Sequence, residues 1–577
     1  MSTLNGRNWL WMFAYGMLSL SLAVYVSTLN PPSEYELSMY AGPPWFVWVL
    51  IGTAMVVSVV LAVYGKEARS RHAGLVLSTS TVVVIGTLPL LRSYQFFGRF
   101  DALNHLGKLH DVLAGVSANT TIYPAIHLLS AVIVRVTGLS PEVALLVTTP
   151  VFVLLFALGL YSIALHWGVS SLGKAVTGIV PLTLPFLISV RLPSLQPLPT
   201  VAALLMFPLL LYLLFNGLQA RRRFTICFLV IAASHVFYHP QHALVLALGI
   251  FLGNLIVMLS PLGDSVRPRF GFSVFIGTLL GAWLYLKPGF WGAVQTVLSG
   301  IESDTGVVEG ASPSGENLET VGGSLVEIGI KVFGPKLILL LGLVVLSSYL
   351  FVRLDGERRP SNKELYLGGL LLAAGLFVPL FAVAFARSQM FRYVGTGMIF
   401  IAVLLSVYNS ERVVPRYHPG VRHLVAVLLL VSALTTLPIA YQSPYVYQPG
   451  DHVTEGEFDG YEFVFEKQHS RPLRTFGTDQ DRYRNALYGR AWPAQAREAN
   501  VEGIAPTRSY VTNRTIDEAN GTFLLTEYTR ARWLRLYPEL GYSEADFEYV
   551  ESAPEIHKLY ANGGTAVYAG RQGGDPE

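Results

Sequence analysis

The sequence is poor in cysteine and in charge, and both shortages narrow what the protein can be. Its single cysteine, Cys227, excludes a disulfide framework and any metal site built from several cysteines. Because Cys227 lies inside an apolar run, we expect it to pack in the core. Charged residues make up only 14% of the chain and hydrophobic residues 52%, whereas soluble domains carry about 25% charged residues. An ordinary soluble protein is therefore excluded.

The chain also lacks a large excess of charge of either sign. Its formal net charge of +3 is too small to indicate a nucleic-acid partner. From Asp451 to the end there are 21 acidic and 14 basic residues, which leaves a balance of +10 for the residues before it. A basic first part therefore precedes an acidic tail.

Long apolar runs are what the sequence has in abundance. A helix of about 20 apolar residues crosses the hydrocarbon layer of a bilayer. Runs near that length occur at residues 9–28, 45–64, 73–91, 142–166, 175–191, 201–217, 224–238, 242–260, 271–288, 334–354, 365–386, 393–410 and 421–441. We therefore predict an all-α polytopic membrane bundle of about 13 transmembrane helices.

Basic residues predict the direction of this bundle, because short cytoplasmic loops retain Lys and Arg. With the N-terminus inside, six basic loops fall inside; they lie at Lys66–Arg71, Lys174, Arg221–Arg223, Arg267–Arg269, Arg353–Lys363 and Arg412–Arg422. We expect an integral protein of the cell membrane with its C-terminal domain outside. The apolar segment Ile122–Gly138 would reverse this order if it spanned, so we predict a helix at the outer membrane surface.

Two regions follow from this topology. Residues 1–441 form the predicted transmembrane domain, with long outer loops at 92–121 and 289–333. Residues 442–577 begin with a Pro/Tyr/Gly-rich linker and are predicted to form a small extracytoplasmic α/β domain.

The tail contains strand-like patterns and possible modification sites. Its expected strands are Tyr461–Phe465, Thr522–Thr526 and Phe547–Val550, with a hairpin over Lys558–Tyr568 that turns at Asn562-Gly563. Three asparagine sequons, at Asn119, Asn513 and Asn520, all fall on the predicted outer side, where such sites can be used.

The first outer loop carries the residues most suited to chemistry. If this stretch is helical, Asp101 and His105 lie one turn apart on one face, with Lys108 a turn further on. A carboxylate there can take a proton from an acceptor hydroxyl or help to hold a cation, so Asp101 and His105 are the catalytic candidates. Lys108 and the nearby His127 are candidates for binding a lipid phosphate. The alternative is a solvated amphipathic helix with incidental ion pairs.

The second outer loop contains the acid pair Glu302-Ser-Asp304. Hard cations prefer clustered oxygen ligands, so both residues could complete a Mg²⁺ or Mn²⁺ site with Asp101. The alternative is that these acids are simply solvated in a Gly/Ser-rich loop.

Two arginines and a histidine cluster lie at other outer turns. Arg387 and Arg392 stand where few cations are expected, and guanidinium groups match phosphate oxygens, so both are candidates for the lipid phosphate. The alternatives are snorkelling to the interface or pairing with the acidic loop. His235, His239 and His242 favour polar lining of a substrate cavity, with His239 as a ligand-binding candidate. A transition-metal site is disfavoured, because Pro240 interrupts the helix there.

The first outer loop and the segment that follows it contain three short motifs, Asp101-x-x-x-His105-x-Gly107, Tyr123-Pro124-x-x-His127-x-Leu129 and Thr137-Gly138-Leu139-Ser140. In this order they resemble the first outer loop of a known enzyme superfamily, the C-type (GT-C) membrane glycosyltransferases. The tail segment Ile556–Gly564, followed by Val567-Tyr568, is similar to the terminal hairpin of these enzymes. Two spans precede the one that leads into the motif loop, where many members have one, and no second acid stands beside Asp101.

The resemblance implies a multispanning enzyme that takes a sugar from a polyprenyl (dolichyl-type) phosphate and transfers it to a glycan, lipid or protein acceptor at the outer face. Asp101 matches the position of the catalytic base or metal-facing carboxylate. The competing interpretations are a transporter or flippase, and a non-catalytic assembly partner with the same fold. A transporter should carry ionisable residues at mid-membrane depth and paired inverted halves.

Overall fold

The computed structural model describes most of the chain. The described residues are 8–117, 121–167, 171–182, 195–219, 221–259, 268–287, 291–292, 295, 322–354, 361–384, 390–411, 419–467, 472–477, 480–491, 505–516, 521–538 and 540–570. The bundle helices are α1 (Asn8–Thr28), α2 (Phe46–Tyr64), α3 (Ala68–Leu91), α6 (Pro141–Trp167), α7 (Ser171–Ile179), α8 (Pro199–Leu218), α9 (Arg222–Tyr238), α10 (Pro240–Leu259), α11 (Gly271–Tyr285), α14 (Leu325–Leu354), α15 (Asn362–Ala384), α16 (Met390–Glu411) and α17 (Pro419–Thr436).

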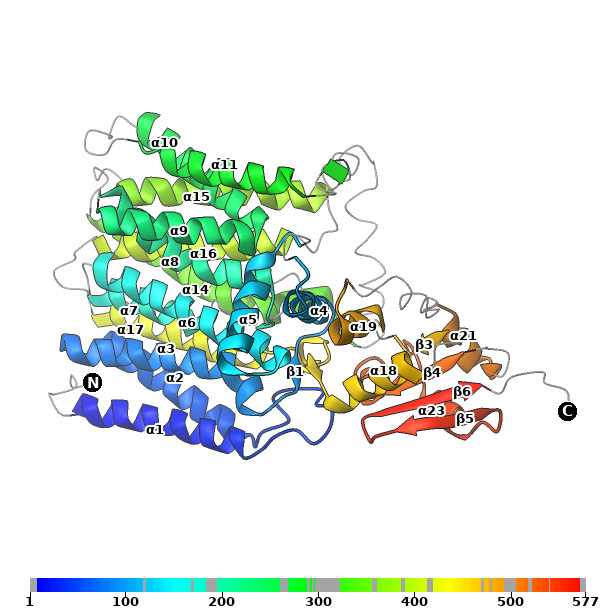
Figure 1. The fold of residues 1–577 in the computed structure, drawn as a ribbon. Helices are drawn as coiled ribbons and strands as arrows, with labels where there is room; N and C mark the ends of the chain where they lie inside the picture. Colours follow the sequence, from blue (N-terminus) through cyan, green and yellow to red (C-terminus); the bar gives the residue numbers. More distant parts are fainter. Residues whose placement is uncertain are drawn as a thin grey trace, which may run out of the picture.

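These helices run side by side (Figure 1), and each of the 13 predicted apolar runs contains one of them at least in part. Within the described chain, eight are long and apolar enough to cross a membrane: α1, α2, α3, α6, α8, α10, α15 and α17. The run at 175–191 is covered only in its first part, by α7 and a 3₁₀ turn (Val180–Leu182), and residues 183–194 lie outside the described chain. The protein is an integral membrane protein.

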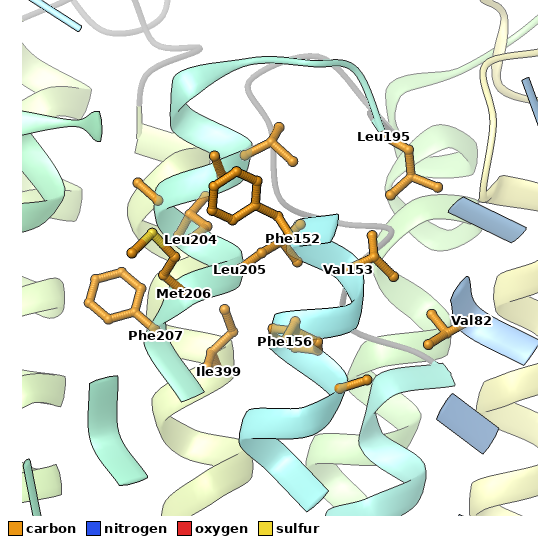
Figure 2. Packing of buried hydrophobic residues seen from close by; sticks show 14 of the residues in the cluster. Val82, Phe152, Val153, Phe156, Leu195, Leu204, Leu205, Met206, Phe207 and Ile399 are labelled. Carbon is orange, nitrogen blue, oxygen red and sulfur yellow. The ribbon is translucent and has the colours of Figure 1, made fainter. Parts of the chain in front are cut away.

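The interior of the bundle is packed where α3, α6, α8 and α16 meet (Figure 2). α8 is central, because nearly all of its side chains are buried. The side chains around it include Val82, Phe152, Val153, Phe156, Leu204, Leu205, Met206, Phe207 and Ile399. Elsewhere a Cβ on Gly369 would lie 2.3 Å from the backbone nitrogen of Gly253. α10 and α15 thus approach closely through small residues, as membrane helices commonly do.

Cys227 does not pack in this interior; it is exposed on α9. The expectation of a core position was wrong, because a membrane helix can be apolar on every side. An apolar run therefore does not tell which face meets other helices and which faces lipid.

Two helices lie at the end of the bundle that faces the C-terminal unit. They are α4 (Asp101–Leu113), seen almost end-on in Figure 1, and α5 (Pro124–Thr137). α5 packs on α4, α6 and α9 and leaves Leu128, Val132 and Val136 exposed at four-residue spacing. An apolar stripe on a helix that lies crosswise fits the predicted surface helix at Ile122–Gly138.

Beyond the same end of the bundle lies the C-terminal unit, the described part of residues 442–570 (Figure 1). A 3₁₀ turn after α17 (Leu437–Ile439) leads into this unit, which begins with a second one (Pro444–Val446). Its elements are β2 (His452–Val453), α18 (Glu455–Lys467), β3 (Leu473–Thr475), α19 (Gln480–Tyr488), α21 (Ala505–Thr512), β4 (Thr522–Thr526), α22 (Glu527–Ala531), the π-helical turn η8 (Arg532–Leu536), α23 (Glu544–Ser552), β5 (Ile556–Ala561) and β6 (Thr565–Gly570).

Four of these strands form a mixed sheet in the order β3-β4-β6-β5. β3 pairs with β4 in parallel, and the other two pairs are antiparallel. The predicted strand Thr522–Thr526 is β4, and the predicted hairpin is β5–β6, which turns at Asn562-Gly563 with Gly563 at φ +86°. Both predictions are confirmed.

The other two predicted strands were wrong, because Tyr461–Phe465 lies in α18 and Phe547–Val550 in α23. Each helix starts with a reciprocal side-chain cap. Thr454 accepts a hydrogen bond from the backbone of Glu457, whose carboxylate accepts one from the backbone of Thr454. Ser543 and Asp546 form the same arrangement before α23. These caps favour a helix at both places, although the alternating aromatic residues of the two segments are typical of a strand.

One short strand pair joins the C-terminal unit to the first outer loop. β1 (Phe96–Phe97) pairs with β2 in antiparallel register, with Phe96 opposite Val453. The loop that leads into α4 is therefore held by residues that follow the last bundle helix.

Candidate active site

The predicted helix after Phe100 is present as α4, and Asp101 is its first residue. Phe100, just before it, has a φ of +55°, a conformation that is unfavourable for a bulky L-residue. The carboxylate of Asp101 is 66% exposed, and its Oδ1 accepts a hydrogen bond of 3.0 Å from Arg482 of α19. Asp101 thus presents a solvent-accessible carboxylate at the end of the bundle next to the C-terminal unit.

His105 and His127 form a buried pair one turn along α4. Nδ1 of His105 and Nε2 of His127 lie 2.9 Å apart, so one ring donates a hydrogen bond to the other. Burial, and then the charge of Lys108, lower the pKa of His105 well below its usual range and that of His127 to about 3. Both imidazoles are therefore neutral near pH 7, and they join α4 to α5.

Lys108 lies between acidic and basic groups. Burial, followed by the charge of Arg490, lowers the pKa of Lys108 to about 8, although Asp101 and Asp111 act in the opposite direction. Its ammonium lies 5.9 Å from the centre of the Tyr123 ring. Lys108 is therefore mostly protonated at neutral pH and loses its charge a little above it.

A row of aromatic rings connects this site with the bundle. Tyr123 stacks on His239 at 5.0 Å with the rings nearly parallel. His239 then lies 4.5 Å from His242, which lies 6.1 Å from Tyr393 of α16. Tyr123 also lies 6.4 Å from His105. The predicted residues His105, Lys108, His127 and His239 are thus brought together around Tyr123.

The other predicted site residues cannot be placed in the same way. Glu302, Asp304 and Arg387 lie outside the described residues, and Arg392 is described only as part of α16, without its side chain. The sequons at Asn119 and Asn520 are likewise outside, whereas Asn513 is exposed just after α21.

The described residues do not by themselves fit a metal. Among them, no group of three His, Cys, Asp or Glu side chains is arranged to hold an ion. Asp101 supplies an oxygen, but an arginine already occupies its Oδ1, and the neighbouring ring nitrogens of His105 and His127 bond to each other. Hard cations such as Mg²⁺ require several clustered oxygens.

Two cavities of the described chain lie away from Asp101. An apolar one of about 540 Å³ lies beside Trp48 and Tyr445. A polar one of about 420 Å³ lies between the α1–α2 loop and the C-terminal unit, and Glu34, Asp459 and Glu527 line it. Neither of these two cavities is bordered by Asp101.

Comparison with known proteins gives matches in fold alone. No protein-family model matches the sequence, and no curated protein is significantly similar to it. ArnT from Cupriavidus metallidurans in the apo state is 12% identical, over 86% of this chain and 98% of ArnT, with a TM-score of 0.49. The arabinofuranosyltransferase AftD from Mycobacteria is 12% identical, over 86% of this chain and 40% of AftD, with a TM-score of 0.44.

A third solved structure is an archaeal oligosaccharyltransferase, AglB from Archaeoglobus fulgidus, in complex with an inhibitory peptide and a dolichol-phosphate. It is 13% identical, over 86% of this chain and 74% of AglB, with a TM-score of 0.42. All three identities are 12–13% and all three TM-scores are below 0.5, so the similarity concerns the fold alone.

Sequence reasoning missed the residues that α19 and the segment just after it bring to the site. Arg482 reaches Asp101, and the backbone N–H groups of Arg490 and Ala491 both donate to the carboxylate of Asp111 at 3.0 Å. These residues follow α4 by about 380 positions along the chain. Charged residues in an acidic tail carry no local signal of such a partner, so nothing in the sequence alone identified them.

The loop before α4 is anchored by a buried ion pair that was also missed. Arg99 donates to the two carboxylate oxygens of Glu457 at 3.1 and 2.7 Å and to the Tyr483 hydroxyl at 2.7 Å. Its guanidinium also lies 3.6 Å from the centre of the Tyr528 ring. Both charges are buried, so each is compensated by the other and by hydrogen bonds.

Proposed function

We propose that this protein is a membrane glycosyltransferase of the GT-C type, which transfers a sugar from a polyprenyl-phosphate donor to a glycan, lipid or protein acceptor at the outer face. The observation that carries the proposal is the exposed carboxylate of Asp101 at the end of the bundle, within the electrostatic reach of Lys108. A base and a cation held together at a membrane surface suit a reaction that removes a proton and releases a phosphate.

The chemistry assigns a role to each group. Asp101 takes the proton of the acceptor hydroxyl while the acceptor oxygen bonds to the anomeric carbon of the sugar. The bond from that carbon to the donor phosphate oxygen breaks, and the polyprenyl phosphate leaves with the electron pair. The proton then passes from Asp101 to water.

Charged and aromatic groups hold the donor. The ammonium of Lys108, with Arg387 and Arg392, offsets the charge of the lipid phosphate. His105 and His127 are neutral and buried, so they hold α4 against α5 and keep Lys108 over Tyr123. The ring of His239 stacks on the ring of Tyr123, and His239 lines the donor site on the side of the bundle.

The proposal includes a divalent cation, for which three residues are candidate ligands. Asp101, Glu302 and Asp304 would hold Mg²⁺ or Mn²⁺, which would neutralise charge on the phosphate. Addition and chelation of Mg²⁺ or Mn²⁺ in the transfer assay test this, and equal rates in both conditions would contradict it.

The proposed topology has 13 spans, an inner N-terminus, and residues 442–577 as an outer domain. This topology requires the α1–α2 loop and the C-terminal unit to lie on the same side, and two contacts between them support that requirement: the backbone N–H of Tyr35 donates to Glu527, and that of Gly450 donates to the carbonyl of Leu37. The start of α1 then lies at the opposite end of the bundle from the C-terminal unit (Figure 1).

The function is tested by the transfer of labelled sugar from polyprenyl phosphate in membranes. Asp101→Asn should lower the rate by about 10²- to 10⁴-fold, because an amide cannot act as a base. Asp481→Asn is the matched control, since Asp481 is also exposed and pairs with Arg484 of its own helix. Asp111 is unsuitable as a control, because it anchors Arg490 and Ala491. Wild-type transfer by Asp101→Asn would refute the assignment.

A transporter is the second candidate, and one residue favours it. Lys336 of α14 is fully buried, and its ammonium donates to the carbonyl of Val332 in the same helix. Ionisable groups inside membrane helices commonly mark ion pathways. Lys336→Met separates the two functions, because a transferase keeps its sugar transfer and a proton- or ion-coupled transporter loses its coupling.

A further inference from the structure

We propose that Arg482 is a positioning residue for Asp101, so that the C-terminal unit aims the carboxylate that performs the transfer. This inference rests on the proposed function and adds a residue to it. It makes α19 a part of the reacting centre, although Arg482 follows Asp101 by 381 positions in the chain.

The first observation is the geometry of the ion pair itself. Arg482 donates to Oδ1 of Asp101 at 3.0 Å, and the guanidinium lies 5.5 Å from the centre of the Phe100 ring. The arginine binds Oδ1, while the Asp101 side chain as a whole stays 66% exposed. One oxygen is therefore held by the arginine, and the other remains to receive the proton of an acceptor hydroxyl.

The second observation concerns the next residue of α19. The hydroxyl of Tyr483 accepts a hydrogen bond from Arg99 at 2.7 Å and lies 3.3 Å from Glu457, to which it can donate. Arg482 and Tyr483 thus contact Asp101 and Arg99, which lie on either side of Phe100. Phe100 has an unfavourable positive φ, and such a conformation persists only where the surroundings hold it.

The third observation is that α19 follows α4 over its whole length. The Asn485 amide donates to Asn104 at 2.9 Å, and Gly107 lies against the backbone of Asn485. Further on, Asp111 accepts from the backbone of Arg490 and Ala491. These contacts fix how the two helices are aligned along their length, and in this alignment Arg482 lies opposite Asp101.

Removal of the guanidinium should therefore affect the chemical step more than donor binding. We expect Arg482→Ala to lower kcat by about 10²-fold, the effect of a small misplacement of a reacting group, with little change in the donor KM. Arg482→Lys should restore part of the loss, because it keeps the charge with a different reach. Arg484→Ala is the matched control, since Arg484 lies on the same helix and pairs with Asp481.

A second background separates positioning from general stability. In an Asp101→Asn protein, Arg482→Ala should cause no further loss, because the group that it positions is already absent. A further loss of the same size in that background would overturn the proposal, as would an Arg482→Ala enzyme that behaves like Arg484→Ala. A wild type that transfers no sugar from any donor would instead overturn the proposed function.

The docking of α19 can also be measured without activity. On a Cys227→Ser background, the pair Asn104→Cys and Asn485→Cys should form a disulfide under mild oxidation, whereas Asn104→Cys with Arg484→Cys should not. Formation of the first crosslink alone supports the register that sets Arg482 on Asp101. Absence of that crosslink, or equal formation of both, would overturn it.

Discussion

Gly107 of α4 lies so close to Asn485 of α19 that a Cβ on the glycine would meet the carbonyl oxygen of Asn485 at 2.1 Å. Backbone atoms cannot move aside as the end of a flexible side chain can. The contact between the two helices therefore depends on the absence of a side chain at position 107, and α19 carries the arginine that binds Asp101.

Gly107→Ala should push α19 away from α4. Overpacking of this kind costs about 1–3 kcal/mol, and we expect a clear loss of sugar transfer in protein that still reaches the membrane. The measurement is the transfer rate per folded protein, with abundance read by fluorescence-detected gel filtration. Gly368→Ala in α15 is the control, because a Cβ there meets nothing within 4 Å. Equal activity of the two variants would contradict the packing argument.

Lys108 predicts a pH dependence of donor binding. Its pKa is lowered to about 8, first by burial and then by Arg490, so it loses its charge as the pH rises through that value. A neutral amine no longer offsets a phosphate, so the donor KM should rise about tenfold between about pH 7 and about pH 9. Lys108→Arg stays charged throughout, and its KM should not change over this range. A wild-type KM that is independent of pH would exclude Lys108 from phosphate binding.

The same shift predicts the direction of a stability change. The pKa of Lys108 is lower in the folded protein than in the unfolded chain, so between about pH 8 and about pH 10.5 the unfolded chain binds more protons. The contribution of Lys108 to stability therefore rises with pH through this window. The melting temperature of the wild type should therefore lie below that of Lys108→Met at neutral pH, and the difference should shrink at high pH.

The buried pair of Arg99 and Glu457 predicts a specific pattern of destabilisation. Glu457→Leu leaves the buried guanidinium uncompensated, which costs about 3–5 kcal/mol. The double variant Arg99→Met/Glu457→Leu removes both charges and should recover much of the loss. Thermal unfolding in detergent measures this, with Glu466→Leu as a control at an exposed position of the same helix. Single and double variants that melt alike would show that charge compensation is not the cause.

The topology can be tested by cysteine labelling from outside on a Cys227→Ser background, which is needed because Cys227 is exposed. A cysteine at Arg222 should be protected, whereas one in α19 should react. Gln480 is buried, so Asp481→Cys is the suitable outer position. Labelling of Arg222→Cys but not of Asp481→Cys would reverse the proposed orientation.

Local signals allowed much of the fold to be predicted, because the information lies within a few residues. A long apolar run needs no partner to indicate a membrane helix, and Asn562-Gly563 favours a tight hairpin by its own backbone preference. Tyr461–Phe465 was misread because alternate aromatic residues suit a strand, and the cap formed by Thr454 and Glu457 decided for a helix.

The candidate site was predictable on the side formed by α4, α5 and the turn between α9 and α10 that carries His239. His105 and His127 lie 22 residues apart within one motif and do meet at 2.9 Å. Arg482 could not be found in this way, since a partner 381 residues distant is fixed by the packing of two helices and not by any pattern near either residue.

The pairing of β1 with β2 also orders events during synthesis of the protein. The loop that carries Asp101 emerges early, but the strand that completes it at His452 and the carboxylate of Glu457 are made only after the last bundle helix. Until then Arg99 lacks its counter-charge, and contacts between such distant segments form late. The growing chain therefore cannot complete the site around Asp101 until the C-terminal unit has been made. A protein truncated after α17 would contain its membrane helices but would lack β2 and Glu457, which hold the segment before α4.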